Sequence, residues 1–305
     1  MSTPPPERSA RRALDERALA RVVQRMQTAP TPPWLHAEVA RRMAERLPII
    51  KRQPTAVIDW GAFLGASREL LAQSYPAARW LAVEPDAQRR DATAAASATA
   101  WWHPSRWTGP GHQVRAEQEV PPQQAQLLWA NMQLHGAIDP QALMTRWHEA
   151  LAVDGFLMFS TLGPGTLPEL RALYARAGWP VPFAPFVDMH DLGDMLVAAG
   201  FADPVMDQET ITLTWPSAQA LLAELHTLGG NVDPRRAAGL RTPRWRARLE
   251  AELGQLADAA GRIGLSFELV YGHAFKAAPA HRVAAKTAVP LQDMQAMVRQ
   301  GRRRV

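Results

Sequence analysis

The stretch VIDWGAFLGASRELLAQSYPAARWLAVEP, residues 57–85, decides the fold of this chain. A short β-branched run ends at Asp59, and Gly61 and Gly65 follow in a loop. A helix is expected next, and a second strand then ends at the acid Glu84. A strand, a glycine-containing loop, a helix and a second strand in this order form the first half of a nucleotide-binding crossover.

Further strands and helices alternate after this crossover. The segment AQLLWANMQLHG (125–136) indicates a strand that runs into a loop, residues 139–151 indicate a helix, and DGFLMFSTLGPG (154–165) indicates a strand led in by a turn. This alternation predicts an α/β fold with a parallel sheet covered by helices on both faces. A last strand, LSFELVYGHAFKA (265–277), comes late in the chain, where antiparallel additions to such sheets are common.

The two ends of the chain differ from this middle part. Residues 1–30 are rich in Pro and Arg, and we expect a flexible arm with a helix near residues 14–26. The apolar residues that follow repeat at helical spacing: Leu35, Val39, Met43 and Leu47. Residues 277–305 carry six Lys or Arg and one acid, and we expect a basic, disordered tail.

Composition excludes several classes of function. The net charge of the 305 residues is +5, and 28 basic and 28 acidic residues remain without the tail, so the charge is no argument for a nucleic-acid partner. The absence of cysteine excludes disulfides and thiolate metal sites. The polar start does not resemble a secretory signal and no apolar run is long enough to span a bilayer, so we expect a cytoplasmic protein.

The loop after the first strand is the candidate ligand site. Gly61 and Gly65 let a ligand approach backbone N–H groups, and Glu84 is placed to accept hydrogen bonds from a ribose diol. The G-x-G-x-x-G run of dinucleotide dehydrogenases does not follow this strand. The sequence also lacks the G-x-S-x-G elbow of α/β-hydrolases, a P-loop and the histidine spacings typical of metal sites.

Residues 57–85 resemble the motif region of class I, S-adenosylmethionine-dependent methyltransferases, which usually reads D-x-G-C-G-x-G. Residues 127–171 are similar to the malonyl-acyl-carrier-protein O-methyltransferases of biotin synthesis. Two blocks are fairly specific to that family, STLGPGTLPEL (160–170) and GLRTPRW (239–245). The resemblance covers roughly residues 34–276, which is most of the chain.

This resemblance implies a Rossmann-like domain at residues 31–276, with a seven-stranded, mostly parallel sheet and helices on both faces. Substrate-side helical insertions are expected at about 164–200 and 217–262. The implied reaction moves a methyl group from S-adenosylmethionine to the free carboxylate of a malonyl thioester, carried by acyl-carrier protein or coenzyme A. A carboxylate is ionised at pH 7, so the enzyme needs positioning rather than acid–base chemistry, and we assign no catalytic residue.

The resemblance also implies the binding residues. Carried over by motif position, the cofactor site comprises Asp59, Gly61, Phe63, Gly65, Glu84, Glu117, Asn131 and Met132. For the acceptor we name His135 and His190, which fall at loop or helix-start positions, and Arg241 and Arg244. The planar guanidinium of an arginine can donate two parallel hydrogen bonds to a carboxylate.

Three positions depart from the family's pattern. Phe63 replaces the middle glycine of the motif, and a phenyl ring there either blocks the cofactor or swings aside. Ala116 stands where the family has an acid that holds the adenine amino group, with Glu117 or Glu119 as substitutes after a small register change. The arm lacks the aromatic F-x-R-A-A-x-x-Y pattern, and the nearest residues are Val22, Val23 and Met26.

Three functions stay open at this point: the malonyl thioester methyltransferase, a methyltransferase with another small acceptor, and an inactive scaffold whose cofactor pocket Phe63 seals. We expect a monomer without metal, nucleic-acid or membrane partners. An acidic carrier protein requires a basic surface, for which we name the arginines of residues 235–248 with Arg171 and Arg176. A cluster of tryptophans is a further candidate pocket wall or partner surface: Trp101, Trp102 and Trp107.

Overall fold

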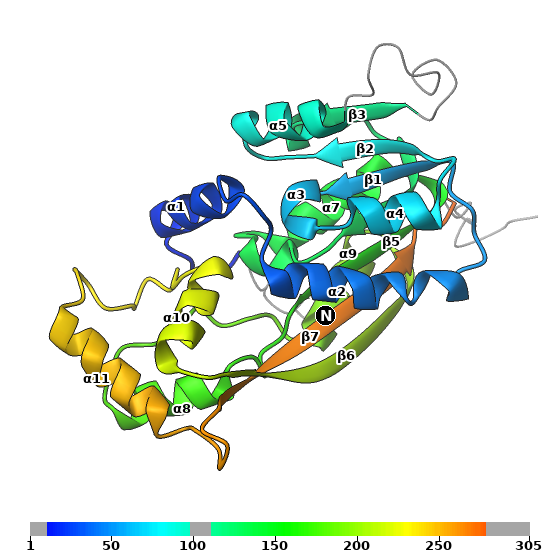
Figure 1. Cartoon of the computed structure of the whole chain (residues 1–305). Coiled ribbons are helices and arrows are strands. Elements are labelled where there is room, and N and C mark those ends of the chain that lie inside the picture. The colour runs from blue at the N-terminus through cyan, green and yellow to red at the C-terminus, as the bar shows by residue number, and fades with distance from the viewer. Residues whose placement is uncertain (1–10, 98–110, 279–305) are drawn as a thin grey trace, which may run out of the picture.

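The computed structural model describes residues 11–97 and 111–278 and contains a seven-stranded sheet flanked by helices (Figure 1). The strands are β1 (Ala56–Trp60), β2 (Arg79–Val83), β3 (His112–Arg115), β4 (Ala125–Ala130), β5 (Leu151–Leu162), β6 (Ala202–Trp215) and β7 (Ile263–Phe275). Neighbouring strands from β3 to β5 are parallel, whereas β7 runs antiparallel to both β5 and β6. The expected mostly parallel sheet, with a late antiparallel strand, is confirmed.

The strand order creates a crevice at one edge of the sheet. Across the sheet the order is β3-β2-β1-β4-β5-β7-β6, so the chain first runs outward from β1 to β3 and then returns to β4 beside β1. Where the strand order reverses, between β1 and β4, the loops that follow these two strands leave the sheet in opposite directions. Open α/β sheets bind their ligands in the crevice between such loops.

Helices cover both faces of this sheet. The α-helices of the described residues are α1 (Glu16–Gln27), α2 (Trp34–Ala44), α3 (Ala62–Gly65), α4 (Arg68–Ser74), α5 (Ala87–Ser97), α7 (Pro140–Ala150), α8 (Pro168–Arg176), α9 (Met189–Ala198), α10 (Ala218–Thr227) and α11 (Pro243–Gly254). Helices α2 and α4 cover one face, and α7 and α9 cover the other (Figure 1). The α2 residues Leu35, Val39 and Met43 are fully buried, which confirms the predicted apolar stripe.

Helices α8, α10 and α11 form a lobe beyond one end of the sheet (Figure 1). The segment 164–200, expected as an insertion, is divided: α8 belongs to the lobe, whereas α9 packs on the sheet because Leu192 and Leu196 join the buried cluster there. Helix α11 begins as predicted. Thr242 Oγ1 accepts a hydrogen bond from the Trp245 N–H, and a proline occupies the first helical turn.

Helix α1 lies within the segment expected as a flexible arm. The Asp15 side chain caps it by accepting from the Ala18 N–H at 2.8 Å, and the Asp15 N–H donates to Val232 O at 2.8 Å. Residues 1–10, the tail from 279 to 305, and the Trp101, Trp102 and Trp107 cluster lie outside the described residues. None of the helices that the structure describes combines the length and apolar character needed to cross a membrane.

Candidate functional site

The loop between β1 and α3 depends on its two glycines. Gly61 has φ +70°, in the left-handed region that favours glycine, and its N–H donates to Val83 O at 2.8 Å. A Cβ on Gly61 would lie 2.3 Å from the Gln133 side chain, and a Cβ on Gly65 would approach Ser67 Oγ at 3.3 Å. The loop therefore packs closely against the segment that follows β4.

Asp59 and Glu84 lie at the carboxyl ends of β1 and β2, as predicted, and both are fully buried. Within the described residues, neither Asp59 oxygen nor Oε2 of Glu84 has a hydrogen-bond donor of ordinary geometry. Oε1 of Glu84 accepts from the Phe63 N–H at 2.8 Å and from Thr93 Oγ1 at 3.1 Å. Burial, followed by repulsion from Glu84, raises the pKa of Asp59 well above its usual value, and burial raises the pKa of Glu84 to about 7.

Phe63 packs against Arg89 and is not part of the cavity wall described below. The Arg89 guanidinium carbon lies 3.5 Å from the centroid of the Phe63 ring. Arg89 also donates from Nε to Gln27 O at 2.7 Å and from Nη2 to Ala29 O at 2.9 Å. The ring thus lies away from this cavity, where its contact with Arg89 joins α3 to α5 and the end of α1.

Asn131, a predicted cofactor residue, is buried in a network that connects three segments. Its amide donates to His36 O and Gly65 O, both at 2.8 Å, and its Oδ1 accepts from Ser160 Oγ at 2.6 Å. The side chain therefore holds α2, the glycine loop and β5 together and does not line the cavity. The next residue, Met132, has φ +55° and does line it.

A cavity of about 830 Å³ lies at the edge of the sheet where β1 to β4 end. Its wall includes one residue from the carboxyl end of each of these four strands in turn: Trp60, Pro85, Glu117 and Met132. This is the position at which ligands bind to open α/β sheets. Asp59 and Glu84 directly precede Trp60 and Pro85 in the chain, and both are fully buried.

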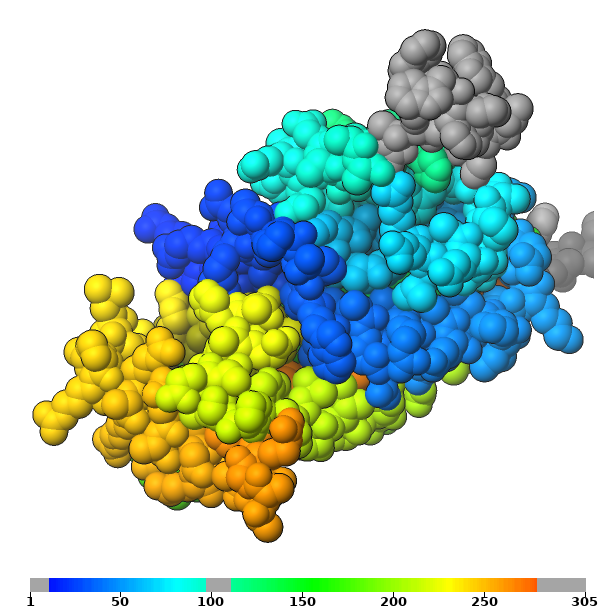
Figure 2. Space-filling view, in the orientation of Figure 1, coloured from blue at the N-terminus to red at the C-terminus, as the bar shows by residue number. Residues whose placement is uncertain are grey.

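Helix α1 and the lobe form the remaining walls, which are mainly apolar. The α1 residues on the wall include Val22, Val23 and Met26, the residues nearest to the family's missing aromatic pattern. Arg25 Nη2 donates to His226 O at 3.1 Å, and this contact joins α1 to α10. Figure 2 shows the α1 and α10 segments side by side across the face of the molecule.

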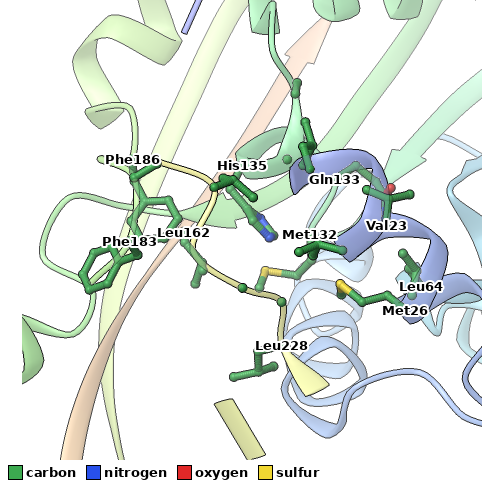
Figure 3. Close-up of a pocket in the computed structure, with 18 of the residues that line it drawn as sticks. Val23, Met26, Leu64, Met132, Gln133, His135, Leu162, Phe183, Phe186 and Leu228 are labelled. Carbon is green, nitrogen blue, oxygen red and sulfur yellow. The ribbon is translucent and has the colours of Figure 1, made fainter. Parts of the chain in front are cut away.

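Two histidines lie together on the wall. The ring centroids of His36 and His135 are 6.2 Å apart, and the rings are nearly perpendicular. Nδ1 of His36 lies 2.8 Å from Leu64 O, so it carries the proton and Nε2 is left as an acceptor. Burial lowers the pKa of His36 to about 4 and that of His135 to about 3, so both rings are neutral at pH 7. The ring centroids of His135 and Phe186 are 6.2 Å apart, and both residues are labelled on the wall in Figure 3.

The other predicted acceptor residues lie outside the cavity. His190 is exposed at the start of α9, with Nδ1 2.9 Å from Asp188 Oδ1. Arg241 and Arg244 are exposed at the start of α11, and the Arg241 guanidinium lies 3.9 Å from the centroid of the Trp245 ring. The structure therefore does not bring these three side chains together with His135.

Three different arginines line the cavity: Arg11, Arg12 and Arg146. Arg11 pairs with Glu16 at 2.5 Å, and Arg146 pairs with Glu117 at 3.0 Å. Glu117, the predicted substitute for the adenine acid, is therefore on the wall but already in an ion pair. Arg12 was not predictable from the sequence, because it lies in the arm, where hydrophobic periodicity is weak. Across residues 11–97 and 111–278, no group of three or more His, Asp or Glu side chains is arranged to hold a metal ion.

The chain is similar to curated relatives along most of its length. It is 38% identical over 251 residues to the malonyl-[acyl-carrier protein] O-methyltransferase of Gallionella capsiferriformans (strain ES-2), a match that covers 80% of this chain and 85% of the relative. It is 35% identical over 262 residues to the enzyme of the same name from Laribacter hongkongensis (strain HLHK9), covering 80% of this chain and 83% of the relative. No family model matches the chain.

Solved structures share its fold at low sequence identity. The YcgJ protein of Bacillus subtilis matches with a TM-score of 0.50 at 10% identity, covering 79% of this chain and 99% of that protein. A candidate methyltransferase from Bacillus halodurans C-125 matches with the same TM-score and identity, covering 78% and 100%. At this identity the likeness supports the fold alone.

Proposed function

The chain belongs to the malonyl-[acyl-carrier protein] O-methyltransferase family, and from this premise we propose that it methylates the free carboxylate of a malonyl thioester with S-adenosylmethionine as donor. The proposal places the chain in biotin synthesis, with the thioester on acyl-carrier protein and coenzyme A as a second carrier. We further propose that it acts as a monomer in the cytoplasm. Gel filtration with light scattering tests the oligomeric state.

The two buried acids next to wall residues in the chain fit the donor in their chemistry. Asp59 and Glu84 have buried oxygens without donors among the described residues, and a ribose diol and an ammonium group are donors of the kind they lack. In this proposal Glu84 binds the ribose, Gly61 permits close approach of the loop, and Met132 packs beside the adenosyl group. The Gln133 side chain, which packs on Gly61, must rotate away to expose the loop.

When bound, S-adenosylmethionine supplies an electrophilic methyl group on a cationic sulfur. A carboxylate with a pKa of about 4 is ionised at pH 7 and attacks without a general base. The residues of this chain therefore have to hold the carboxylate in line and to exclude water. The apolar wall, which includes Met26, Leu162 and Phe183, serves both purposes, and it strengthens the attraction between opposite charges because its polarity is low.

One observation carries the proposal: a mainly apolar cavity lies where β1 to β4 end, and next to its wall residues in the chain are two buried acids with three oxygens, both of Asp59 and Oε2 of Glu84, that have no donor of ordinary geometry among the described residues. A packed core has no need of such carboxyl groups, because burying them without partners costs stability. Their cost is offset if a ligand supplies the donors. The neutral imidazoles of His36 and His135 on the same wall are compatible with a reaction that needs no proton transfer.

The experiment is an incubation of the purified protein with S-adenosylmethionine and malonyl-acyl-carrier protein, followed by mass spectrometry of the carrier. We expect the carrier to gain the mass of one methyl group as a base-labile ester. Acetyl-acyl-carrier protein, which has no free carboxylate, is the matched control and should gain nothing. Glu84→Ala should weaken S-adenosylhomocysteine binding by about 1–3 kcal/mol in calorimetry. Absence of the ester at saturating donor would overturn the proposal.

A further inference from the structure

Arg12 is fixed on the cavity wall by backbone carbonyls. Its Nη1 donates to His135 O and, at 3.4 Å, to Ala137 O, and its Nη2 donates to Pro185 O at 2.7 Å. Its backbone N–H donates to Ile138 O at 2.7 Å. These contacts hold the guanidinium beside the segment that follows β4, on the same wall as His135.

The charge of Arg12 has no counter-ion in the part of the chain that the structure describes. Arg11 and Arg146, on the same wall, each pair with a glutamate, whereas Arg12 contacts only neutral carbonyls. Burial lowers the pKa of Arg12, which is the expected effect of placing a cation among neutral groups. Proteins rarely bury a charge without pairing it, so this partly buried guanidinium is suited to pair with an anion that a ligand supplies.

The unused donors of Arg12 suit a carboxylate. The three carbonyls take three of the five guanidinium N–H groups. The Nε–H and one Nη2–H have no acceptor within residues 11–97 and 111–278. Donors on neighbouring guanidinium nitrogens form the fork that binds both oxygens of a carboxylate. His135, whose carbonyl Arg12 holds, also has a buried ring nitrogen, Nδ1, without a partner there.

We propose that Arg12 binds the free carboxylate of the acceptor and that this contact selects the charged substrate over the uncharged product. The inference rests on the proposed function, because it takes the acceptor to be a malonyl thioester. Methyl transfer forms a C–O bond to one carboxylate oxygen and breaks the C–S bond of the donor. The carboxylate charge and the sulfonium charge disappear together, and the ester that forms has no charge to pair with Arg12.

The selection can be measured as a ratio of two affinities. The probes are malonyl-N-acetylcysteamine as substrate and its methyl ester as competitive inhibitor. In the wild type, the inhibition constant of the ester should exceed the KM of the substrate at least about tenfold, as expected for a lost charge-assisted contact. In Arg12→Met, the KM should rise about 10- to 100-fold and the ratio should fall toward one. The affinity for S-adenosylhomocysteine should stay unchanged, because Arg12 acts on the acceptor.

Two further variants separate recognition from structure. Arg17→Met removes a charge from the exposed side of α1, five residues after Arg12 and away from the cavity wall, and should keep the wild-type ratio. Arg12→Lys keeps the charge but loses the fork, so its ratio should fall between those of the wild type and Arg12→Met. If Arg12→Met does not fold, Arg12→Lys decides the matter: a wild-type ratio in that variant overturns the inference. A lower kcat with an unchanged ratio in Arg12→Met also overturns it, since that result indicates a structural role only.

Failure of this inference differs from failure of the proposed function. A wild-type protein that forms no methyl ester from any malonyl thioester overturns the proposed function. A wild-type protein that forms the ester, with variants at Arg12 that keep the same preference for the charged acceptor, overturns the role of Arg12 alone.

Discussion

At the scale of single residues, burial decides the chemistry of this site as much as residue type does. The spacing after the first strand was sufficient to place Asp59 and Glu84 at strand ends, because each acid directly follows a buried apolar run. Their complete burial was not predictable. Glu84 accepts hydrogen bonds from the Phe63 N–H and from Thr93 Oγ1, and a strand pattern does not predict contacts with residues outside the strand. The same limit hid Arg12, whose partners are carbonyls far along the chain.

The raised pKa of Glu84 predicts that S-adenosylhomocysteine binds more tightly as pH rises from about 6 to about 8. With a pKa of about 7, the free protein holds Glu84 mainly protonated at the lower pH. Hydroxyl donors favour the carboxylate form, so binding below pH 7 must expel a proton. Affinity should rise up to about tenfold per pH unit below 7 and level off above it. Calorimetry in two buffers of different ionisation enthalpy measures the released proton.

The matched variant for this prediction is Glu84→Gln, which has no charge at any pH. It should bind the ligand more weakly and with a smaller pH dependence, since Asp59, whose pKa is also raised, remains. A dependence as large as that of the wild type would contradict the assignment. Stability gives an independent check. An acid whose pKa is raised on folding, here from 4.5 to about 7, costs stability as pH rises through that range. The ligand-free wild type should therefore lose more stability than Glu84→Gln between these pH values.

At the scale of elements, local sequence patterns predict those helices and strands whose signals lie within their own residues. The stripe of α2, the cap of α11 and the late strand β7 were all found from local patterns. The turn expected at Asp154-Gly155 is wrong: β5 begins at Leu151 and passes through it, with a register irregularity against β4 and φ +63° at Asp154. A local pattern cannot distinguish a turn from a bulge, because the partner strand decides which one forms.

The position of α1 depends on contacts with the lobe, and the Asp15–Arg236 ion pair at 2.7 Å is one of them. Asp15→Asn should keep the helix cap but lose this pair, because asparagine also caps helices. We expect amide exchange in α1 to become about two- to fivefold faster, the range of a partly exposed ion pair. Hydrogen exchange followed by mass spectrometry, resolved to residues 16–27, measures the effect.

A double-mutant cycle tests whether this ion pair is the cause. Arg236→Met alone should have the same effect as Asp15→Asn, and combining the two should add little, because both remove one interaction. Arg41→Met is the matched control: Arg41 is on the exposed side of α2 and pairs with Glu38 and Glu45 away from the cavity. Unchanged exchange in α1 in both single variants would show that other contacts hold the helix.

At the scale of the whole molecule, the position of charge matters more than its sum. Composition was sufficient to show that the chain without its tail is balanced, and it drew attention to the arginines of residues 235–248. The structure divides this set, because Arg235 pairs with Asp233 and Arg236 with Asp15. Charge reversal at these two positions would therefore disturb the fold.

Two other arginines of this segment, Arg241 and Arg248, lie over a row of aromatic rings that reaches the cavity. Tyr174, on the cavity wall, lies 5.2 Å from Trp179 between ring centroids, and Trp179 lies 5.4 Å from Trp245. The Arg248 guanidinium lies over Trp179, and Arg244 is exposed nearby in sequence at the start of α11. An acidic carrier protein that docks on α11 would therefore lie next to the lobe side of the cavity.

Charge reversal on α11 should then raise the KM for the carrier-bound substrate and leave the KM for a substrate without a carrier unchanged. The double variant Arg244→Glu with Arg248→Glu should raise the KM for malonyl-acyl-carrier protein about tenfold at low salt, because like charges at an interface slow association. The KM for malonyl-N-acetylcysteamine, which has no carrier, should not change. Added salt should shrink the difference between variant and wild type, since it screens exposed charges. Lys51→Glu, an exposed reversal before β1, is the control, and an equal rise in that variant would rule out a specific docking surface on α11.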